Sequence, residues 1–152
     1  MTCPYTLVAW DISGTLQDQR TGLLFDGIRE ILEALKAQDV KLAICTDLGN
    51  RRAHAFVEEN RIEHLIDSIQ HTGMNPFKPS KEMLEMAMID CAVTMPSQVC
   101  MVGDSGCDIA LAHAMKSVSI YASYGSFDES VLYEEPHHVA DSVKNLRKIL
   151  NI

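Results

Sequence analysis

LVAWDISGTL, residues 7–16, joins an apolar run to an acidic residue and a glycine. The first four residues are apolar and include strand formers, which indicates a short strand buried on both faces. Asp11 follows directly, and Gly14 allows a tight turn that brings backbone N–H groups near the carboxylate. The stretch therefore predicts a buried strand that presents Asp11 at one edge of a sheet.

Similar apolar runs alternate with helical patterns along the chain. Strands are expected at residues 40–45, 98–102 and 118–121. Helices are expected at residues 27–38, 51–60, 108–115 and 143–150, and a further helix buries Met83, Leu84, Ala87 and Met88. This alternation predicts an α/β fold, with a mostly parallel Rossmann-like sheet covered by helices on both faces.

Length and charge limit the possible functions. A chain of 152 residues with 47% hydrophobic residues is expected to form one domain over residues 1–152. The net charge of −8 argues against nucleic-acid partners and anionic membranes. A phosphorylated substrate remains compatible, because a bound divalent cation and one lysine can reverse the field locally.

The cysteine pattern and the hydropathy of the chain bear on its location. Five cysteines without a CxxC pair are typical of a reduced chain rather than a disulfide scaffold. No signal-peptide pattern and no apolar run of about 20 residues is found. We therefore expect a cytoplasmic protein without a membrane partner.

Polar groups follow three of the expected strands. Asp11, Thr46 and Asp104 each come directly after an apolar run. Because the carboxyl ends of parallel strands lie at one edge of a sheet, these three residues should converge. Lys78 lies in a loop that contains two prolines, and Asp108 follows Asp104 by four residues. A carboxylate, a hydroxyl, an ammonium and a carboxylate pair are typical of a metal-assisted phosphoryl-transfer site.

Each of these residues has a plausible role in such a reaction. Asp11 would attack phosphorus and form an aspartyl-phosphate. Asp11 and Asp104 would hold Mg²⁺, with Asp108 bound directly or through water. Lys78 would bind the phosphoryl oxygens and screen Asp11, while Thr46 would donate a hydrogen bond to the same group. The expected cofactor is Mg²⁺, and the expected partner is a phosphorylated small molecule or macromolecule.

The four segments resemble the four motifs of the haloacid dehalogenase (HAD) superfamily of phosphohydrolases. DISGT at 11–15 resembles the first motif, whose leading Asp is the nucleophile. ICTD at 44–47 resembles the second, with Thr46 as the phosphate-binding hydroxyl, and KP at 78–79 resembles the third. GDSGCD at 103–108 resembles the fourth motif, whose acids hold Mg²⁺. The resemblance implies the HAD-type fold.

The spacing of the motifs resembles that of the capless branch of this superfamily. Only 35 positions separate Asp11 from Thr46, and 32 separate Thr46 from Lys78. Cap domains of the family are inserted in such intervals, and neither interval has room for a substantial one. An open site implies a large substrate or a lid from a neighbouring subunit, so a homo-oligomer that covers the site is an expectation.

Ser13 departs from the pattern of the family. Most phosphatases of the family have Asp there, which protonates the leaving group and then activates water. A serine hydroxyl is too weak an acid and base for this near neutral pH, and a missing general acid–base costs about 10²–10⁴ in rate. The backbone carbonyl of Ser13 could still bind Mg²⁺, so binding should survive better than turnover.

Three functions therefore stay open. The favoured one is phosphate-monoester hydrolysis through Asp11, slow or specialised because of Ser13. The second is other chemistry, since dehalogenases and phosphonate-cleaving members also lack the second Asp. These members rely on cap residues, however, and dehalogenases need no metal, whereas Asp104 and Asp108 are intact here. The third is a catalytically degenerate protein that binds a phosphorylated ligand or a protein partner without turnover.

For several residues near the motifs, the sequence predicts a structural role or only a general position. Asp47 is expected to be a turn or helix-capping residue. Residues 17–22 are polar with a turn signal, which predicts a small hairpin or flap near the site. An exposed loop is expected at His137 and His138. Residues expected to line the site or form a subunit contact are Tyr121, Tyr124 and Phe127.

Overall fold

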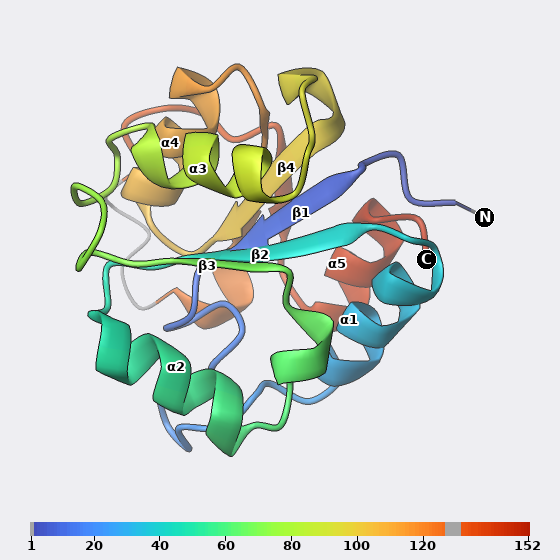
Figure 1. Cartoon of the computed structure of the whole chain (residues 1–152). Helices are drawn as coiled ribbons and strands as arrows, with labels where there is room; N and C mark the ends of the chain where they lie inside the picture. Colours follow the sequence, from blue (N-terminus) through green and yellow to red (C-terminus); the bar gives the residue numbers. More distant parts are fainter. Residues whose placement is uncertain (1, 127–131) are drawn as a thin grey trace.

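The computed structural model describes residues 2–126 and 132–152, so that Phe127 lies outside the described residues (Figure 1). Its centre is a six-stranded sheet in the order β3-β2-β1-β4-β5-β6. All pairings between neighbouring strands are parallel. The strands are β1 (Leu7–Trp10), β2 (Lys41–Cys45), β3 (Ser68–Gln70), β4 (Val99–Gly103), β5 (Val118–Ala122) and β6 (His138–Ala140).

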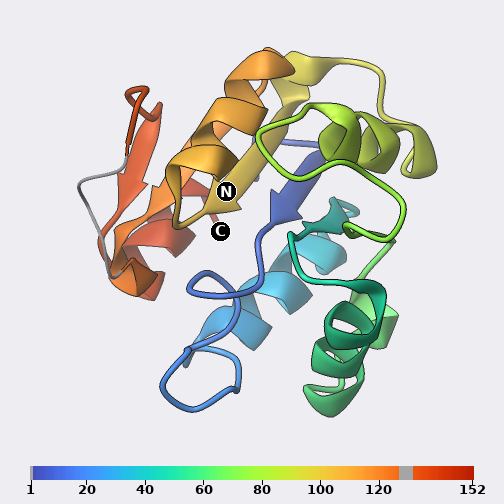
Figure 2. The same cartoon turned by 90° about the vertical axis from the view of Figure 1, so that its left-hand side faces the viewer.

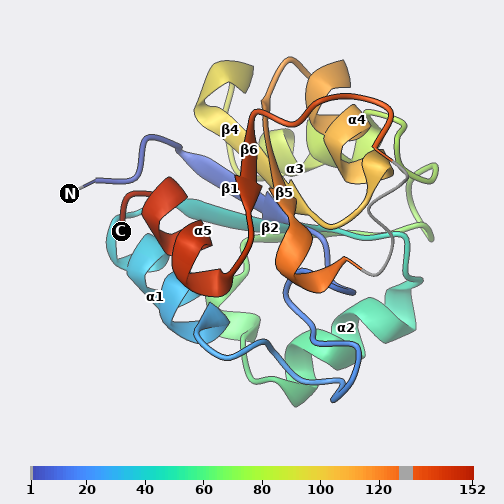
Figure 3. The same cartoon turned by 180° about the vertical axis from the view of Figure 1, so that it is seen from behind.

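Helices cover both faces of this sheet, as predicted. They are α1 (Ile28–Ala37), α2 (Asn50–Glu59), α3 (Glu82–Asp90), α4 (Gly106–Ala114) and α5 (Val143–Ile149). Figures 1 and 3 show α3 and α4 on one face, and α1, α2 and α5 on the other. The α/β fold with a parallel, Rossmann-like sheet is therefore confirmed. No helix in the described part of the chain is long and apolar enough to span a bilayer.

The central strand β1 is buried on both faces because its side chains alternate between two clusters. Val8 and Trp10 belong to the larger cluster, on the side of α1, α2 and α5. Leu7 and Ala9 belong to the smaller cluster, which includes residues of α3 and α4. This burial explains why the sequence of β1 is a continuous apolar run rather than an alternating one.

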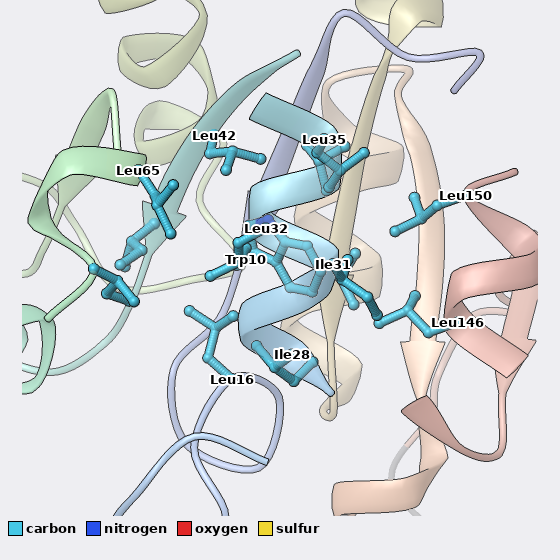
Figure 4. Packing of buried hydrophobic residues seen from close by; sticks show 14 of the residues in the cluster. Trp10, Leu16, Ile28, Ile31, Leu32, Leu35, Leu42, Leu65, Leu146 and Leu150 are labelled. Atoms are coloured by element: carbon cyan, nitrogen blue, oxygen red, sulfur yellow. The ribbon is translucent and has the colours of Figure 1, made fainter. Parts of the chain in front are cut away.

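Helix α1 anchors the larger cluster with one apolar face. Ile28, Ile31, Leu32 and Leu35 recur at helical spacing and are all buried. Figure 4 shows the indole of Trp10 lying among the side chains of Ile31 and Leu32. The packing fixes the end of β1, and therefore the position of the residue that follows it.

The short connections leave no inserted domain in the described chain between residues 11 and 78. After β1 the chain forms a turn closed by an antiparallel bridge between Gln17 and Leu24, as expected for a small hairpin. The remaining length is used by α1, β2, α2, a short 3₁₀ turn and β3.

One expectation about secondary structure is wrong in part. An exposed loop is expected at His137 and His138, and His137 lies exposed in such a loop. His138 instead begins β6, which pairs with β5 through Ile120 and His138. The strand has only three residues, which are too few to show an alternating pattern. Its conformation is decided by backbone pairing to β5 rather than by a local sequence signal.

We predict that Leu32→Ala lowers the free energy of unfolding by about 2–5 kcal/mol, because it leaves a cavity in the larger cluster. Leu23→Ala is the matched control, since Leu23 is 59% exposed. Its effect should stay within about 0.5 kcal/mol. Urea unfolding of the two variants measures both values, and equal losses of stability would contradict this description of the core.

Candidate active site

Three of the predicted site residues follow neighbouring strands at the centre of the sheet. Asp11 follows β1, Thr46 follows β2 and Asp104 follows β4, and β1 lies between the other two strands. Figure 2 shows the ends of β1, β2 and β4 side by side, viewed from this edge. The backbone N–H of Asp11 donates to the carbonyl of Val102 at 3.0 Å, which extends the β1–β4 pairing to the site.

A hollow of about 280 Å³ opens at this edge. The predicted site residues that line it are Asp11, Ser13, Thr46, Lys78 and Asp104. Asp108 lies underneath, fully buried, and contacts Lys78. All six residues expected to form the site are therefore brought together; their roles are proposals, taken up below.

Lys78 connects the acids of the site. Its Nζ donates to Asp11 Oδ1 at 3.0 Å, to Asp108 Oδ1 at 2.5 Å and to the carbonyl of Cys45 at 3.1 Å. The side chain is only 3% exposed. A buried ammonium needs such partners, because an unpaired buried charge is very costly.

Asp108 serves two partners with its two carboxylate oxygens. Oδ1 accepts from Lys78, while Oδ2 accepts from the backbone N–H of Ser105 at 3.2 Å and from its hydroxyl at 3.0 Å. Together with Ser105 it forms a capping box at the start of α4. Asp108 is thus both a helix-capping acid and a member of the site.

Burial and mutual repulsion raise the pKa values of the acids. Burial raises the pKa of Asp11 to about 6, with Asp104 acting in the same direction and Lys78 opposing. Burial and the charge of Asp11 raise the pKa of Asp108 to about 6 against the effect of Lys78. Burial also raises the pKa of Asp104.

The lysine behaves differently because it has two negative partners. Burial lowers the pKa of Lys78, but the carboxylates of Asp108 and Asp11 outweigh burial and raise it well above its usual range. One ammonium is shared by the carboxylates of Asp11 and Asp108. It therefore stays protonated, while each acid receives only part of the compensation.

Two glycines allow the acids to pack this closely. A Cβ on Gly14, whose φ is +78°, would lie 2.2 Å from Asp104 Oδ2. A Cβ on Gly103 would lie 2.2 Å from the carboxylate of Asp108. Any side chain at these two positions would displace the acids. The close packing of the carboxylates therefore requires glycine at both positions.

The acids fit a hard divalent cation. One carboxylate oxygen from each of Asp11, Asp104 and Asp108 lies within 4.8 Å of the other two. Oxygen donors of this kind, in small number, suit Mg²⁺, which usually keeps several waters. The Thr15 hydroxyl lies 3.5 Å from Asp104 Oδ1 and donates to it weakly.

The hydroxyl of Thr46 can donate a hydrogen bond into the hollow. Thr46 is buried, and its Oγ1 accepts the backbone N–H of Leu48 at 3.1 Å. The hydroxyl donates to no other group among the described residues, so its proton is available for an acceptor in the hollow.

The sequence did not reveal the contact of Asp47. Its Oδ1 accepts the backbone N–H of Lys78 at 2.9 Å, and it lines the hollow. Of the two expected roles, that of a turn residue is confirmed, because Asp47 lies in a bend between β2 and α2. It does not cap the helix, since the N-cap of α2 is Gly49 without a side-chain cap. The two partners are 31 residues apart, and no local pattern connects them.

The tyrosines expected near the site differ in position. The Tyr124 hydroxyl donates to the carbonyl of Thr15 at 2.8 Å and so supports the turn after Asp11. Tyr121 is buried within β5, and its hydroxyl has no hydrogen-bond partner among the described residues. Neither tyrosine lines the hollow that contains Asp11.

Residues 10–122 match the family model described as haloacid dehalogenase-like hydrolase. The phosphoglycolate phosphatase of Aliivibrio fischeri is 29% identical over 133 residues, which are 85% of this chain and 57% of that protein. That of Mannheimia succiniciproducens is 26% identical over 129 residues, or 84% and 57% of the two chains. The chain therefore spans little more than half the length of these curated relatives.

A solved structure supports the same fold. The haloacid dehalogenase-like hydrolase family protein from Streptococcus pneumoniae has a TM-score of 0.81 at 16% identity. The match covers 95% of this chain and 98% of that one. At this identity the likeness concerns the fold alone.

We predict that Mg²⁺ stabilises the protein more at about pH 7.5 than at about pH 5. With the pKa of Asp11 and Asp108 raised to about 6, their contribution to stability is complete below about pH 4 and is lost as the pH rises through 6. The deprotonated acids then bind the cation, whereas Lys78 stays charged throughout.

Thermal unfolding with and without Mg²⁺ at the two pH values measures the effect. Asp104→Asn is the control, and the rise in Tm caused by Mg²⁺ should be largely lost in it. An equal rise at both pH values, or a rise unaffected by Asp104→Asn, would contradict the assignment.

Proposed function

The chain belongs to the haloacid dehalogenase-like hydrolase family, and we propose that it hydrolyses phosphate monoesters through a covalent aspartyl-phosphate on Asp11. One observation carries this proposal. The carboxylate of Asp11 lies in an open hollow and is paired, at 3.0 Å, with a buried ammonium that Asp108 also holds. A nucleophile and a fixed positive charge beside it are what attack on an anionic phosphoryl group requires.

The chain's own residues would bind and orient the phosphoryl group. Lys78 would contact its oxygens and offset the repulsion between Asp11 and the substrate. Thr46 would donate its free hydroxyl proton to another oxygen. Because strand ends and buried contacts hold these groups in place, little reorganisation is needed when charge develops.

Two displacements at phosphorus complete the proposed reaction. A carboxylate oxygen of Asp11 forms a bond to phosphorus as the bond to the alcohol oxygen breaks, and the leaving alkoxide takes a proton from water. Water then attacks the same phosphorus, the bond to Asp11 breaks, and inorganic phosphate leaves after giving one proton to the hydroxide formed in the first step. Ser13 assists neither proton transfer, so both steps should be slower than with a carboxylic acid in its place.

Mg²⁺ is the proposed cofactor. When bound, it neutralises the charge that accumulates between the acids and the phosphoryl group. Asp11 and Asp104 would hold it together with the carbonyl of Ser13. Both oxygens of Asp108 already accept hydrogen bonds, so Asp108 would act through water and through Lys78.

The substrate is proposed as a phosphorylated small molecule or macromolecule. Phosphoglycolate, which the names of the curated relatives contain, is one candidate. A second copy of the chain that covers the open hollow is the accompanying proposal.

A second function is favoured by Ser13 itself. Without an acid at this position, the site could bind a phosphorylated ligand or a protein partner and not turn it over. The metal site and the phosphoryl-binding groups would be the same in both cases, so turnover decides between them.

We predict that the wild type releases phosphate from an activated aryl phosphate only with Mg²⁺, and that Asp11→Asn abolishes this release. Ser13→Asp should raise the turnover by about tenfold or more, because it restores a general acid–base. Steady-state rates with and without Mg²⁺ measure both effects, and Ser13→Asn serves as a control that adds bulk without an acid.

The outcomes separate the two functions. Mg²⁺ binding without turnover in the wild type would favour the binding protein. Activity that survives Asp11→Asn would contradict the covalent route, and no gain from Ser13→Asp would contradict the argument about the missing acid.

A further inference from the structure

We propose that the site selects phosphate monoesters whose alcohol carries no negative charge, and that Asp47 is the specificity-determining residue. This inference rests on the proposed hydrolysis and deepens it by naming the substrate class. It argues against a phosphorylated carboxylic acid, such as phosphoglycolate, as the preferred substrate.

Asp47 holds a fixed negative charge at the mouth of the hollow. It comes directly after Thr46, lines the hollow and is exposed to solvent. An exposed carboxylate is usually free to turn away, but Oδ1 of Asp47 accepts the backbone N–H of Lys78 at 2.9 Å. This hydrogen bond keeps the charge beside the path of an incoming ester.

Among the described residues that line the hollow, none supplies a cation that is free to offset this charge, and the proposed Mg²⁺ would be taken up by Asp11, Asp104 and the phosphoryl group. Of the described residues that line it, Asp11, Asp47 and Asp104 are acids, and Lys78 is the single cation. The ammonium of Lys78 is buried and already shared between Asp11 and Asp108. A carboxylate on the leaving alcohol would therefore meet Asp47 without a partner of its own.

Neutral hydrogen-bonding groups surround the same opening. Ser13, Gln19 and Ser105 also line the hollow. Hydroxyl and amide groups can bind the hydroxyls of a neutral alcohol, and Asp47 can attract an ammonium group. The mouth is thus suited to uncharged or cationic leaving groups.

The nearest basic side chain on the adjoining hairpin does not change this balance. Arg20 lines a separate hollow beside the site, together with Asp18. Its Nε lies 3.1 Å from Asp18 Oδ1 and its Nη2 lies 3.3 Å from Asp18 Oδ2. The two charges largely cancel, so little positive field is left for a substrate carboxylate.

Three esters with two-carbon alcohols test the proposal. These are 2-phosphoglycolate, 2-hydroxyethyl phosphate and phosphoethanolamine, whose leaving groups are anionic, neutral and cationic. We expect the wild type to have its lowest kcat/KM for 2-phosphoglycolate. Asp47→Asn should raise the ratio of kcat/KM for 2-phosphoglycolate to that for 2-hydroxyethyl phosphate by about 3- to 10-fold, and high salt should reduce this change.

Asp47→Ala and Asp39→Asn serve as controls for Asp47→Asn. Asp47→Asn removes the charge alone, because the new side chain keeps an amide oxygen for the Lys78 N–H. Asp47→Ala removes both the charge and the acceptor, and should also lower kcat for all three esters. Asp39→Asn makes the same change of charge at the opposite edge of the sheet, between α1 and β2. It should leave the ratio unchanged.

A binding measurement keeps the test independent of turnover. Asp11→Asn with Mg²⁺ should bind the three esters with Kd values in the order of their charge, tightest for phosphoethanolamine, and adding Asp47→Asn should reduce the differences. Charge-ordered binding without hydrolysis by the wild type would overturn the proposed function and support the selectivity. Hydrolysis with 2-phosphoglycolate preferred, or a ratio that Asp47→Asn leaves unchanged, would overturn the selectivity alone.

Discussion

A single buried ammonium holds the site together. Lys78 pairs with Asp11 at the end of β1 and with Asp108 at the start of α4, and it also donates to the carbonyl that ends β2. Removing one partner from such a buried network is costly, because the remaining charges lose their compensation. The loop that carries Lys78 is therefore tied to the sheet and to α4 through one group. The positions of the Asp11 and Asp108 carboxylates depend on it.

The parallel sheet makes this arrangement possible. Neighbouring strands end at one edge, so residues far apart in the chain meet there without a dedicated scaffold. The cost is crowding of negative charge, which is visible in the raised pKa values of Asp11 and Asp108. Gly14 and Gly103 leave the room that the acids need. A site of this kind favours a divalent cation and a phosphoryl group, which together balance the charges.

The sequence was sufficient for features that depend on local pattern. Apolar runs located β1, β2, β4 and β5, and the polar residues after them located Asp11, Thr46 and Asp104. Contacts made only in the folded chain could not be anticipated. The hydrogen bond from the backbone N–H of Lys78 to Asp47 joins residues 31 positions apart, and β6 depends on pairing with β5. The substitution at Ser13 was visible in the sequence, but its effect on rate is a property of the reaction and not of the fold.

Asp11 is proposed to accept the phosphoryl group, and trapping the phosphorylated protein would detect this intermediate. The protein would be incubated with acetyl phosphate and Mg²⁺, quenched in acid and measured by intact mass spectrometry and peptide mapping. We expect one phosphoryl group, located on Asp11, which persists longer in the wild type than in Ser13→Asp. A wild-type protein that stays unmodified while it hydrolyses the reagent, or one modified at another residue, would contradict it.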